Sequence, residues 1–121
     1  MSKILIIEDE TGLRETVAEL LSLAGYKTVE AKDGIDGLEK VYNELPDLIL
    51  CDIMMPKLDG YGFLEQHQLS EYSHIPVLLL TAKIESNDEL IGMRLGAKGY
   101  IKKPFNFQAL NQIVKSYLFS E

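Results

Sequence analysis

The segment Leu48-Ile49-Leu50-Cys51-Asp52 decides the fold of this chain, because four consecutive apolar residues end in a carboxylate. Such a run is typical of a parallel strand that is buried on both faces. Ile4–Ile7 and Val77–Leu80 have the same character. Lys27–Ala31 and Gly99–Ile101 are weaker candidates that include or adjoin lysines, as edge strands often do. We therefore expect three central strands and two edge strands.

Helical patterns separate these five strand candidates. In five stretches, apolar residues recur at spacings of three and four, the pattern of an amphipathic helix. The apolar residues of these stretches run from Leu13 to Ala24, Leu38 to Leu45, Phe63 to His67, Leu90 to Leu95 and Leu110 to Leu118. Five strand–helix units in succession predict an α/β three-layer sandwich with right-handed crossovers. A parallel sheet in the order 2-1-3-4-5 fits this pattern.

Single residues in the helical stretches lead to further predictions about the ends, the stability and the exposure of these helices. Gly25 and Pro46 are expected to end the first and second helices. Asn106 is a candidate N-cap of the last helix. Gly92 should weaken the fourth helix by about 1 kcal/mol relative to Ala. His67 is expected on the surface of the third helix.

The composition argues against several classes of protein. The 121 residues include 12 Lys and Arg against 19 Asp and Glu, a net charge of −7, which disfavours binding to nucleic acid. No apolar stretch approaches the ~20 residues of a membrane span, and we expect no signal sequence, because the apolar run after Lys3 is too short for one. The single cysteine, Cys51, is expected to be a small buried hydrophobe. We expect one cytoplasmic domain over residues 1–121, with no nucleic-acid or membrane partner.

Carboxylates follow two of the central strand candidates. Glu8 and Asp9 come after the first strand, and Asp52 comes after the third. In a sheet of this order, the ligand crevice lies beyond the carboxyl ends of these two strands. Carboxylates that converge there need a cation or a raised pKa, and oxygen ligands suit Mg²⁺ or Mn²⁺. The sequence therefore predicts a divalent metal site.

A hydroxyl group and an ammonium group complete the polar set. Thr81 follows the fourth strand and Lys103 follows the fifth. Carboxylates, a divalent cation, a lysine and a hydroxyl together suggest phosphoryl transfer, with Asp52 as the nucleophile. Lys103 would neutralise charge on the phosphoryl oxygens, and the Thr81 hydroxyl and the Ala82 backbone N–H would donate hydrogen bonds to them. Each residue alone has an ordinary structural explanation, so the hypothesis depends on their joint placement.

These residues resemble the receiver domain of two-component response regulators over essentially the whole chain. The matching segments are Ile4–Asp9, Leu48–Pro56 with Asp59-Gly60, Leu79–Ala82 and Gly96–Phe105. The resemblance implies the flavodoxin-like fold of receivers. It also implies a signalling domain that catalyses only its own phosphorylation and dephosphorylation.

The resemblance assigns roles around the metal. Asp52 matches the phosphorylated aspartate. Asp9 matches the direct Mg²⁺ ligand of the acidic pair, and Glu8 matches the partner that acts mainly through water. The backbone carbonyl of Met54 matches the third protein ligand. The phosphoryl donor is then a phosphohistidine of a sensor histidine kinase or a phosphotransfer domain.

The resemblance also assigns the switch. Thr81 and Lys103 match the groups that contact the phosphoryl group, and Tyr100 matches the switch aromatic. The Lys103–Pro104 bond matches a cis peptide of the family. Phosphorylation would change the surface of the fourth helix, the fifth strand and the fifth helix. That surface would pass the signal to an unknown downstream effector, and a homodimer through it is a further hypothesis.

The chain departs from the family pattern in minor ways. Glu8 stands where Asp is also common, and Lys98-Gly99 replaces a more usual acidic pair before Tyr100. In the family that the chain resembles, the positions two beyond the aspartate and two beyond the threonine influence hydrolysis of the phosphoryl group, and they match Met54 and Lys83 here. Because the side chain of Met54 cannot orient water by hydrogen bonding, we expect slow self-dephosphorylation.

Three other functions are compatible with parts of this sequence. A flavin mononucleotide carrier would share the sheet order, but Glu8 and its acidic neighbours would repel the phosphate. A phosphohydrolase would need a substrate cap, for which 121 residues leave no room. The remaining alternative is a pseudo-receiver that binds proteins without phosphorylation. We expect no effector domain in this chain, which leaves a stand-alone regulator, a relay shuttle or the N-terminal part of a longer regulator.

Overall fold

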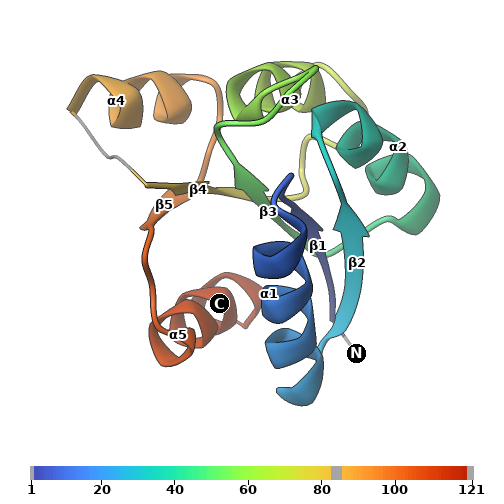
Figure 1. Ribbon diagram of the computed structural model, residues 1–121. Helices are drawn as coiled ribbons and strands as arrows, with labels where there is room; N and C mark the ends of the chain where they lie inside the picture. Colours follow the sequence, from blue (N-terminus) through green and yellow to red (C-terminus); the bar gives the residue numbers. More distant parts are fainter. Residues whose placement is uncertain (1, 83–85, 120–121) are drawn as a thin grey trace.

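The computed structural model describes residues 2–82 and 86–119, in which five parallel strands form one sheet. The strand order is β2-β1-β3-β4-β5, which confirms the predicted topology (Figure 1). The strands are β1 (Lys3–Ile7), β2 (Lys27–Ala31), β3 (Leu48–Asp52), β4 (Val77–Thr81) and β5 (Gly99–Lys102). Asp52 and Thr81 are the last residues of β3 and β4, at the strand ends where the sequence places them.

Five helices alternate with the strands, also as predicted. They are α1 (Thr11–Leu23), α2 (Gly34–Glu44), α3 (Gly60–Gln68), α4 (Ser86–Arg94) and α5 (Phe107–Leu118). Gly25 follows α1 with a φ of 101°, a left-handed conformation that favours glycine. Pro46 lies just beyond the end of α2. The side chain of Asn106 accepts a hydrogen bond from Ala109 N at 2.7 Å, which confirms it as the N-cap of α5.

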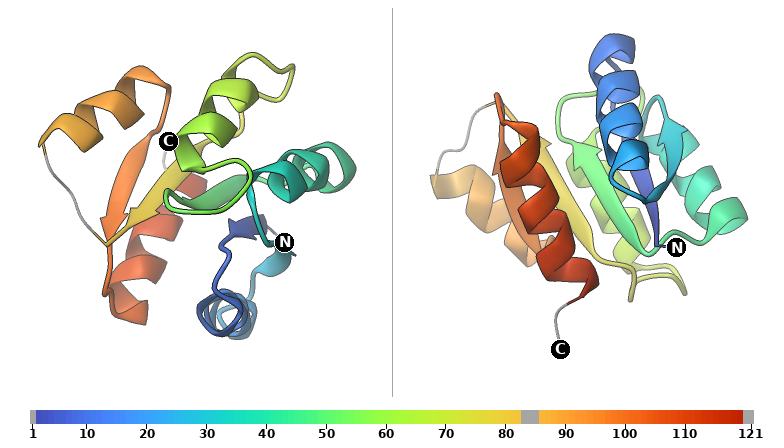
Figure 2. Two further views of the ribbon diagram at one scale, coloured as in Figure 1. Left: turned by 45° about the horizontal axis from the view of Figure 1, so that its top comes forward. Right: turned by 90° about the horizontal axis from the view of Figure 1, so that it is seen from below.

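The helices cover both faces of the sheet and so create two apolar cores. Helices α1 and α5 pack on one face, and α2, α3 and α4 lie on the other (Figure 2). Alternate residues of the central strands enter the two cores, because successive side chains of a strand point to opposite faces. Ile4 and Ile6 face α1 and α5, whereas Leu5 and Ile7 face the opposite core. Cys51 is fully buried in that second core, as expected.

His67 is buried, and the prediction that it lies on the helix surface is wrong. Its side chain is 0% exposed and stacks on Phe63, with ring centroids 5.6 Å apart. Its Nε2 atom lies 2.9 Å from the carbonyl oxygen of Ile75, so the neutral ring donates its proton there. Burial is the main cause that lowers the pKa of His67. A histidine can be buried here because its polar ring has a backbone hydrogen-bond partner in Ile75 and a stacking partner in Phe63.

The register of the strands brings the site residues to one edge of the sheet. Ile7 pairs with Cys51, and Asp52 pairs with Leu80. Thr81 pairs with Lys102. The residues that follow these pairs therefore emerge together at the carboxyl edge. Within residues 2–82 and 86–119, no helix is long and apolar enough to cross a membrane.

Candidate functional site

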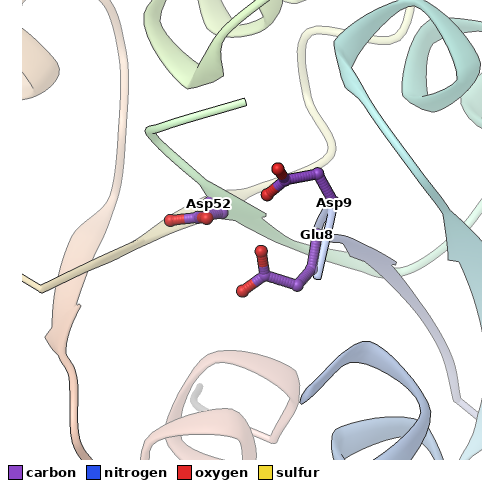
Figure 3. A group of neighbouring side chains, drawn as sticks. All are labelled: Glu8, Asp9 and Asp52. Carbon is purple, nitrogen blue, oxygen red and sulfur yellow. The ribbon is translucent and has the colours of Figure 1, made fainter. Parts of the chain in front are cut away.

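Three carboxylates converge where β1 and β3 end. Glu8, Asp9 and Asp52 each offer an oxygen atom, and these atoms lie within 4.8 Å of one another. The three carboxyl groups end around a common space (Figure 3). Glu8 is only 1% exposed and Asp52 only 6%, whereas Asp9 is exposed. One ligand from solvent can therefore contact all three groups from the open side of Asp9.

Lys103 reaches into this cluster from the other end of the sequence. Its Nζ atom lies 2.6 Å from Oε1 of Glu8 and 3.3 Å from Oδ2 of Asp52. The backbone N–H of Lys103 donates to the carbonyl oxygen of Thr81 at 2.8 Å, which continues the pairing of β5 with β4. The Lys103–Pro104 peptide bond is cis. The lysine thus bridges two of the three carboxylates.

Burial and charge shift the pKa values of this pair. For Glu8, burial raises the pKa most, a hydrogen bond with Asp52 raises it further, and Lys103 opposes both. For Lys103, burial is the largest single influence and lowers the pKa. The hydrogen bond with Glu8 and the charges of Asp52 and Glu8 outweigh burial, so the pKa of Lys103 is raised. The lysine therefore stays protonated at neutral pH.

Thr81 and Ala82 border the same site. Thr81 is 6% exposed and is the last residue of β4. The exposed Ala82 lines a cavity of about 460 Å³ beside Lys103, together with Leu13, Pro104 and Phe105. The small side chain of Ala82 leaves this approach to Lys103 open.

The β3–α3 loop carries Met54 and is fixed at both ends. Gly60 N donates to the Ile53 carbonyl oxygen at 2.8 Å. A Cβ atom on Gly60 would lie 2.5 Å from the Asp52 carbonyl oxygen and 2.7 Å from Ile53 Cα, so the loop can close only with glycine there. Gly34 N donates to the Leu58 carbonyl oxygen at 3.1 Å, which ties the loop to α2. The Met54 side chain is 79% exposed.

Tyr100 lies apart from the carboxylates. It occupies β5, pairs with Leu79 of β4 and is half-buried against the core on the α4 side. Lys83, which the sequence marked as a position that influences hydrolysis, is outside the described residues.

Sequence reasoning missed Arg14. Its Nη1 atom donates to the Glu8 carbonyl oxygen at 2.8 Å, and its Nε atom lies 3.1 Å from Oε1 of Glu30. Arg14 therefore connects α1 and β2 to the backbone of the acidic cluster. The sequence signal that could have identified Arg14 is its position in the first turn of the helix that follows the acidic residues.

A family profile described as the response regulator receiver domain matches residues 4–115 of the chain. The chain is 40% identical over 116 residues to the alkaline phosphatase synthesis transcriptional regulatory protein PhoP of Bacillus subtilis (strain 168), which covers 96% of the chain and 48% of that protein. It is 39% identical over 118 residues to a transcriptional regulatory protein CpxR homolog of Haemophilus influenzae, covering 98% of the chain and 51% of that protein. The chain spans about half the length of these curated relatives.

The fold is also found in solved structures. Chemotaxis protein CheY4 of Vibrio cholerae aligns with a TM-score of 0.93 and 32% identity, covering 98% of this chain and 99% of that one. A CheY-like response regulator receiver domain protein of Methanospirillum hungatei aligns with a TM-score of 0.91 and 28% identity, covering 98% of this chain and 94% of that one.

Proposed function

The chain belongs to the response regulator receiver domain family, and from this premise we propose that Asp52 accepts a phosphoryl group in a Mg²⁺-dependent reaction. The donor is a phosphohistidine of a sensor histidine kinase or a phosphotransfer domain. The observation that carries this proposal is the position of Lys103, whose Nζ lies 3.3 Å from Asp52 and 2.6 Å from Glu8. A nucleophilic carboxylate beside a cation and two further acidic groups is the arrangement that phosphoryl transfer needs.

The donor set fits a hard divalent cation. When ionised, the three carboxylates and Lys103 carry a formal charge of −2, which one Mg²⁺ or Mn²⁺ neutralises. Asp9 and Asp52 would hold the ion directly, with the backbone carbonyl of Met54, and Glu8 would act through water. A bound Mg²⁺ supplies positive charge that stabilises the phosphoryl oxygens in the transition state.

The protein groups then have defined tasks. An Asp52 carboxylate oxygen attacks the phosphorus atom as the P–N bond of the phosphohistidine breaks, and the histidine keeps the electron pair of that bond and takes up a proton. The Lys103 ammonium group neutralises charge on the transferred group. The Thr81 hydroxyl and the Ala82 backbone N–H donate hydrogen bonds to its oxygens. The chain thus catalyses its own phosphorylation and dephosphorylation and does not turn over a substrate.

Phosphorylation is the input to a switch. It adds about −1.5 to −2 charge beside Thr81. Thr81 moves toward that charge, Tyr100 follows into the space released, and the α4–β5–α5 surface changes. This surface contacts the downstream effector, in keeping with the transcriptional regulators among the relatives.

Leu90, Ile91 and Met93 are exposed on α4 of this surface and also support a homodimer. A monomer in sedimentation, with and without a phosphoryl analogue, would exclude the homodimer.

Intact mass spectrometry after incubation with acetyl phosphate tests the proposal. We expect one phosphoryl adduct per chain that requires Mg²⁺ and is absent from Asp52→Ala. Asp47→Asn is the matched control, because Asp47 is an exposed carboxylate that hydrogen-bonds Lys3 N and lies outside the cluster.

Two results would contradict phosphorylation of Asp52. One is an adduct that persists in Asp52→Ala. The other is the absence of any adduct from folded protein with both acetyl phosphate and a phosphorylated histidine donor. The second result would favour the pseudo-receiver that binds proteins without phosphorylation.

A further inference from the structure

In the part of α4 whose burial is described, Leu90–Arg94, the residue that is buried against the domain is a glycine, Gly92. Its neighbours Leu90, Ile91 and Met93 are 57%, 45% and 50% exposed. Large apolar side chains usually attach an amphipathic helix to its sheet. In this part of α4, the buried contact with the rest of the domain lies at Gly92, which has no side chain.

The side chain of Tyr100 fills the missing volume. A Cβ atom on Gly92 would overlap the Tyr100 hydroxyl and lie 2.7 Å from Tyr100 Cζ. The same atom would lie 3.0 Å from Cδ1 of Leu79, the β4 residue that pairs with Tyr100. Figure 1 shows α4 beside β4 and β5, where this contact forms. The tyrosine therefore projects from β5 into a hole in α4 that only glycine can leave open.

The backbone does not require glycine at this position. Gly96, two residues beyond the end of α4, has a φ of 103°, whereas Gly92 has no φ in the left-handed region and lies inside the helix. Glycine inside a helix lowers its stability relative to alanine. The structural reason for a glycine at this position is the space that it leaves for the Tyr100 side chain.

The alternative position of Tyr100 lies along the same face of the sheet. Thr81 is two residues beyond Leu79 on β4, and residues two apart in a strand point to the same side. A tyrosine that moves toward Thr81 therefore leaves the hole at Gly92. Tyr100 cannot both remain seated against α4 and follow Thr81.

We propose that Gly92 is a positioning residue of the switch, because its missing side chain forms the seat in which Tyr100 holds α4 against the sheet in the unphosphorylated state. The inference rests on the proposed function, which takes Tyr100 as the switch aromatic and Asp52 as the phosphorylation site. When Tyr100 leaves, the described part of α4, Leu90–Arg94, loses its buried contact, and the helix can shift. The seat thus converts a side-chain movement into a helix movement.

A pair of glycine-to-alanine variants tests the seat. Gly92→Ala closes the hole, whereas Gly12→Ala makes the same change in α1, where the new Cβ meets only Glu10 Oε1 at 3.7 Å. Both proteins are labelled with 3-fluorotyrosine, and the Tyr100 resonance is assigned with Tyr100→Phe. In unliganded Gly92→Ala, we expect this resonance to shift toward its position in wild-type protein saturated with Mg²⁺ and beryllofluoride. Gly12→Ala should leave it unchanged.

The same variants should differ in affinity for beryllofluoride. Closing the seat disfavours the unphosphorylated state, so a larger fraction of the protein is in the conformation that binds beryllofluoride. The apparent Kd for beryllofluoride at saturating Mg²⁺ therefore falls by about threefold or more. An unshifted Tyr100 resonance and an unchanged Kd in Gly92→Ala would overturn the seat. If beryllofluoride moves no tyrosine resonance in the wild-type protein, the proposed function fails. A displaced Tyr100 resonance in unliganded Gly92→Ala would then support the packing of Tyr100 against Gly92 and not its part in the switch.

A double variant covers the case in which Gly92→Ala does not fold. Tyr100→Ala removes the ring, so adding Gly92→Ala to it should leave the urea midpoint unchanged or raised. A loss of stability that is equally large with and without the Tyr100 ring would overturn the inference.

Discussion

The ammonium group of Lys103 lies closer to Oε1 of Glu8, at 2.6 Å, than to Oδ2 of Asp52, at 3.3 Å. The two partners of the shorter contact are 95 residues apart in the sequence. Glu8 therefore shares the lysine with Asp52, the carboxylate proposed as the nucleophile. Because a phosphoryl group on Asp52 would offer new oxygen atoms to Lys103, Glu8 is the group from which the lysine would be drawn.

Glu8→Gln should stabilise the metal-free protein at neutral pH, because the neutral amide avoids the cost of a buried negative charge. Burial raises the pKa of Glu8, so the folded state resists ionisation of this group. The stability that protonated Glu8 contributes is complete below its unfolded pKa of 4.5. It is lost as the pH rises through the pKa of Glu8 in the folded protein. Urea unfolding in a chelator should show the gain at about pH 7 and none at about pH 4. A loss of stability at neutral pH would show that the ion pair with Lys103 outweighs burial.

Mg²⁺ should stabilise the folded protein by mass action, by about 1.4 kcal/mol at ten times its Kd. Chelation should reverse the effect completely. Thermal unfolding measured over a Mg²⁺ series should show this gain for wild type and Asp47→Asn. Asp9→Asn and Asp52→Asn should reduce it strongly, because each removes an oxygen ligand from the cluster. Equal responses in all four proteins would place the ion elsewhere.

His67→Gln should remove part of the stability loss at acidic pH. Because burial lowers the pKa of His67, the unfolded chain binds its proton more readily. His67 therefore adds stability above the unfolded pKa of 6.5, and this is lost as the pH falls, by up to about 1.4 kcal/mol one pH unit lower. Urea midpoints at about pH 7.5 and 5.5 measure the difference, with the exposed His74→Gln as control. If the stability of wild type and of His67→Gln depends on pH in the same way, the lowered pKa of His67 is refuted.

Gly60→Ala should destabilise the fold by about 1–3 kcal/mol, the usual cost of overpacking. The new Cβ would lie 2.5 Å from the backbone carbonyl oxygen of Asp52 and 2.7 Å from Ile53 Cα, and backbone cannot rotate away as a side chain can. Urea unfolding compares it with Gly12→Ala, whose Cβ has room. If the two variants are equally stable, the loop is less constrained than its contacts indicate.

Met54→Asn should accelerate dephosphorylation of phosphorylated Asp52. The wild-type side chain is 79% exposed and cannot orient an attacking water by hydrogen bonding, whereas an amide can. Loss of the phosphoryl adduct over time, followed by intact mass, gives the rate. Met54→Leu, which is also apolar, should decay like the wild type. An unchanged dephosphorylation rate in Met54→Asn would contradict the idea that the apolar side chain of Met54 slows hydrolysis.

The sequence alone determined the topology and the polar edge of the site. The apolar runs at Ile4, Leu48 and Val77 identified the central strands, because burial on both faces leaves a local signal in hydrophobicity. The strand order then placed Glu8 and Asp52 together, since parallel strands end at one edge. The observed convergence of their carboxylates agrees with that reasoning.

Tertiary structure decided which residues these groups contact. The sequence gives no sign that Lys103 prefers Glu8, that His67 is buried or that Gly92 receives Tyr100. Hydrophobic periodicity reports the environment of a residue along its own helix or strand. Ion pairs and holes in the packing form between segments distant in the chain, so they are fixed only when the sheet and its helices assemble.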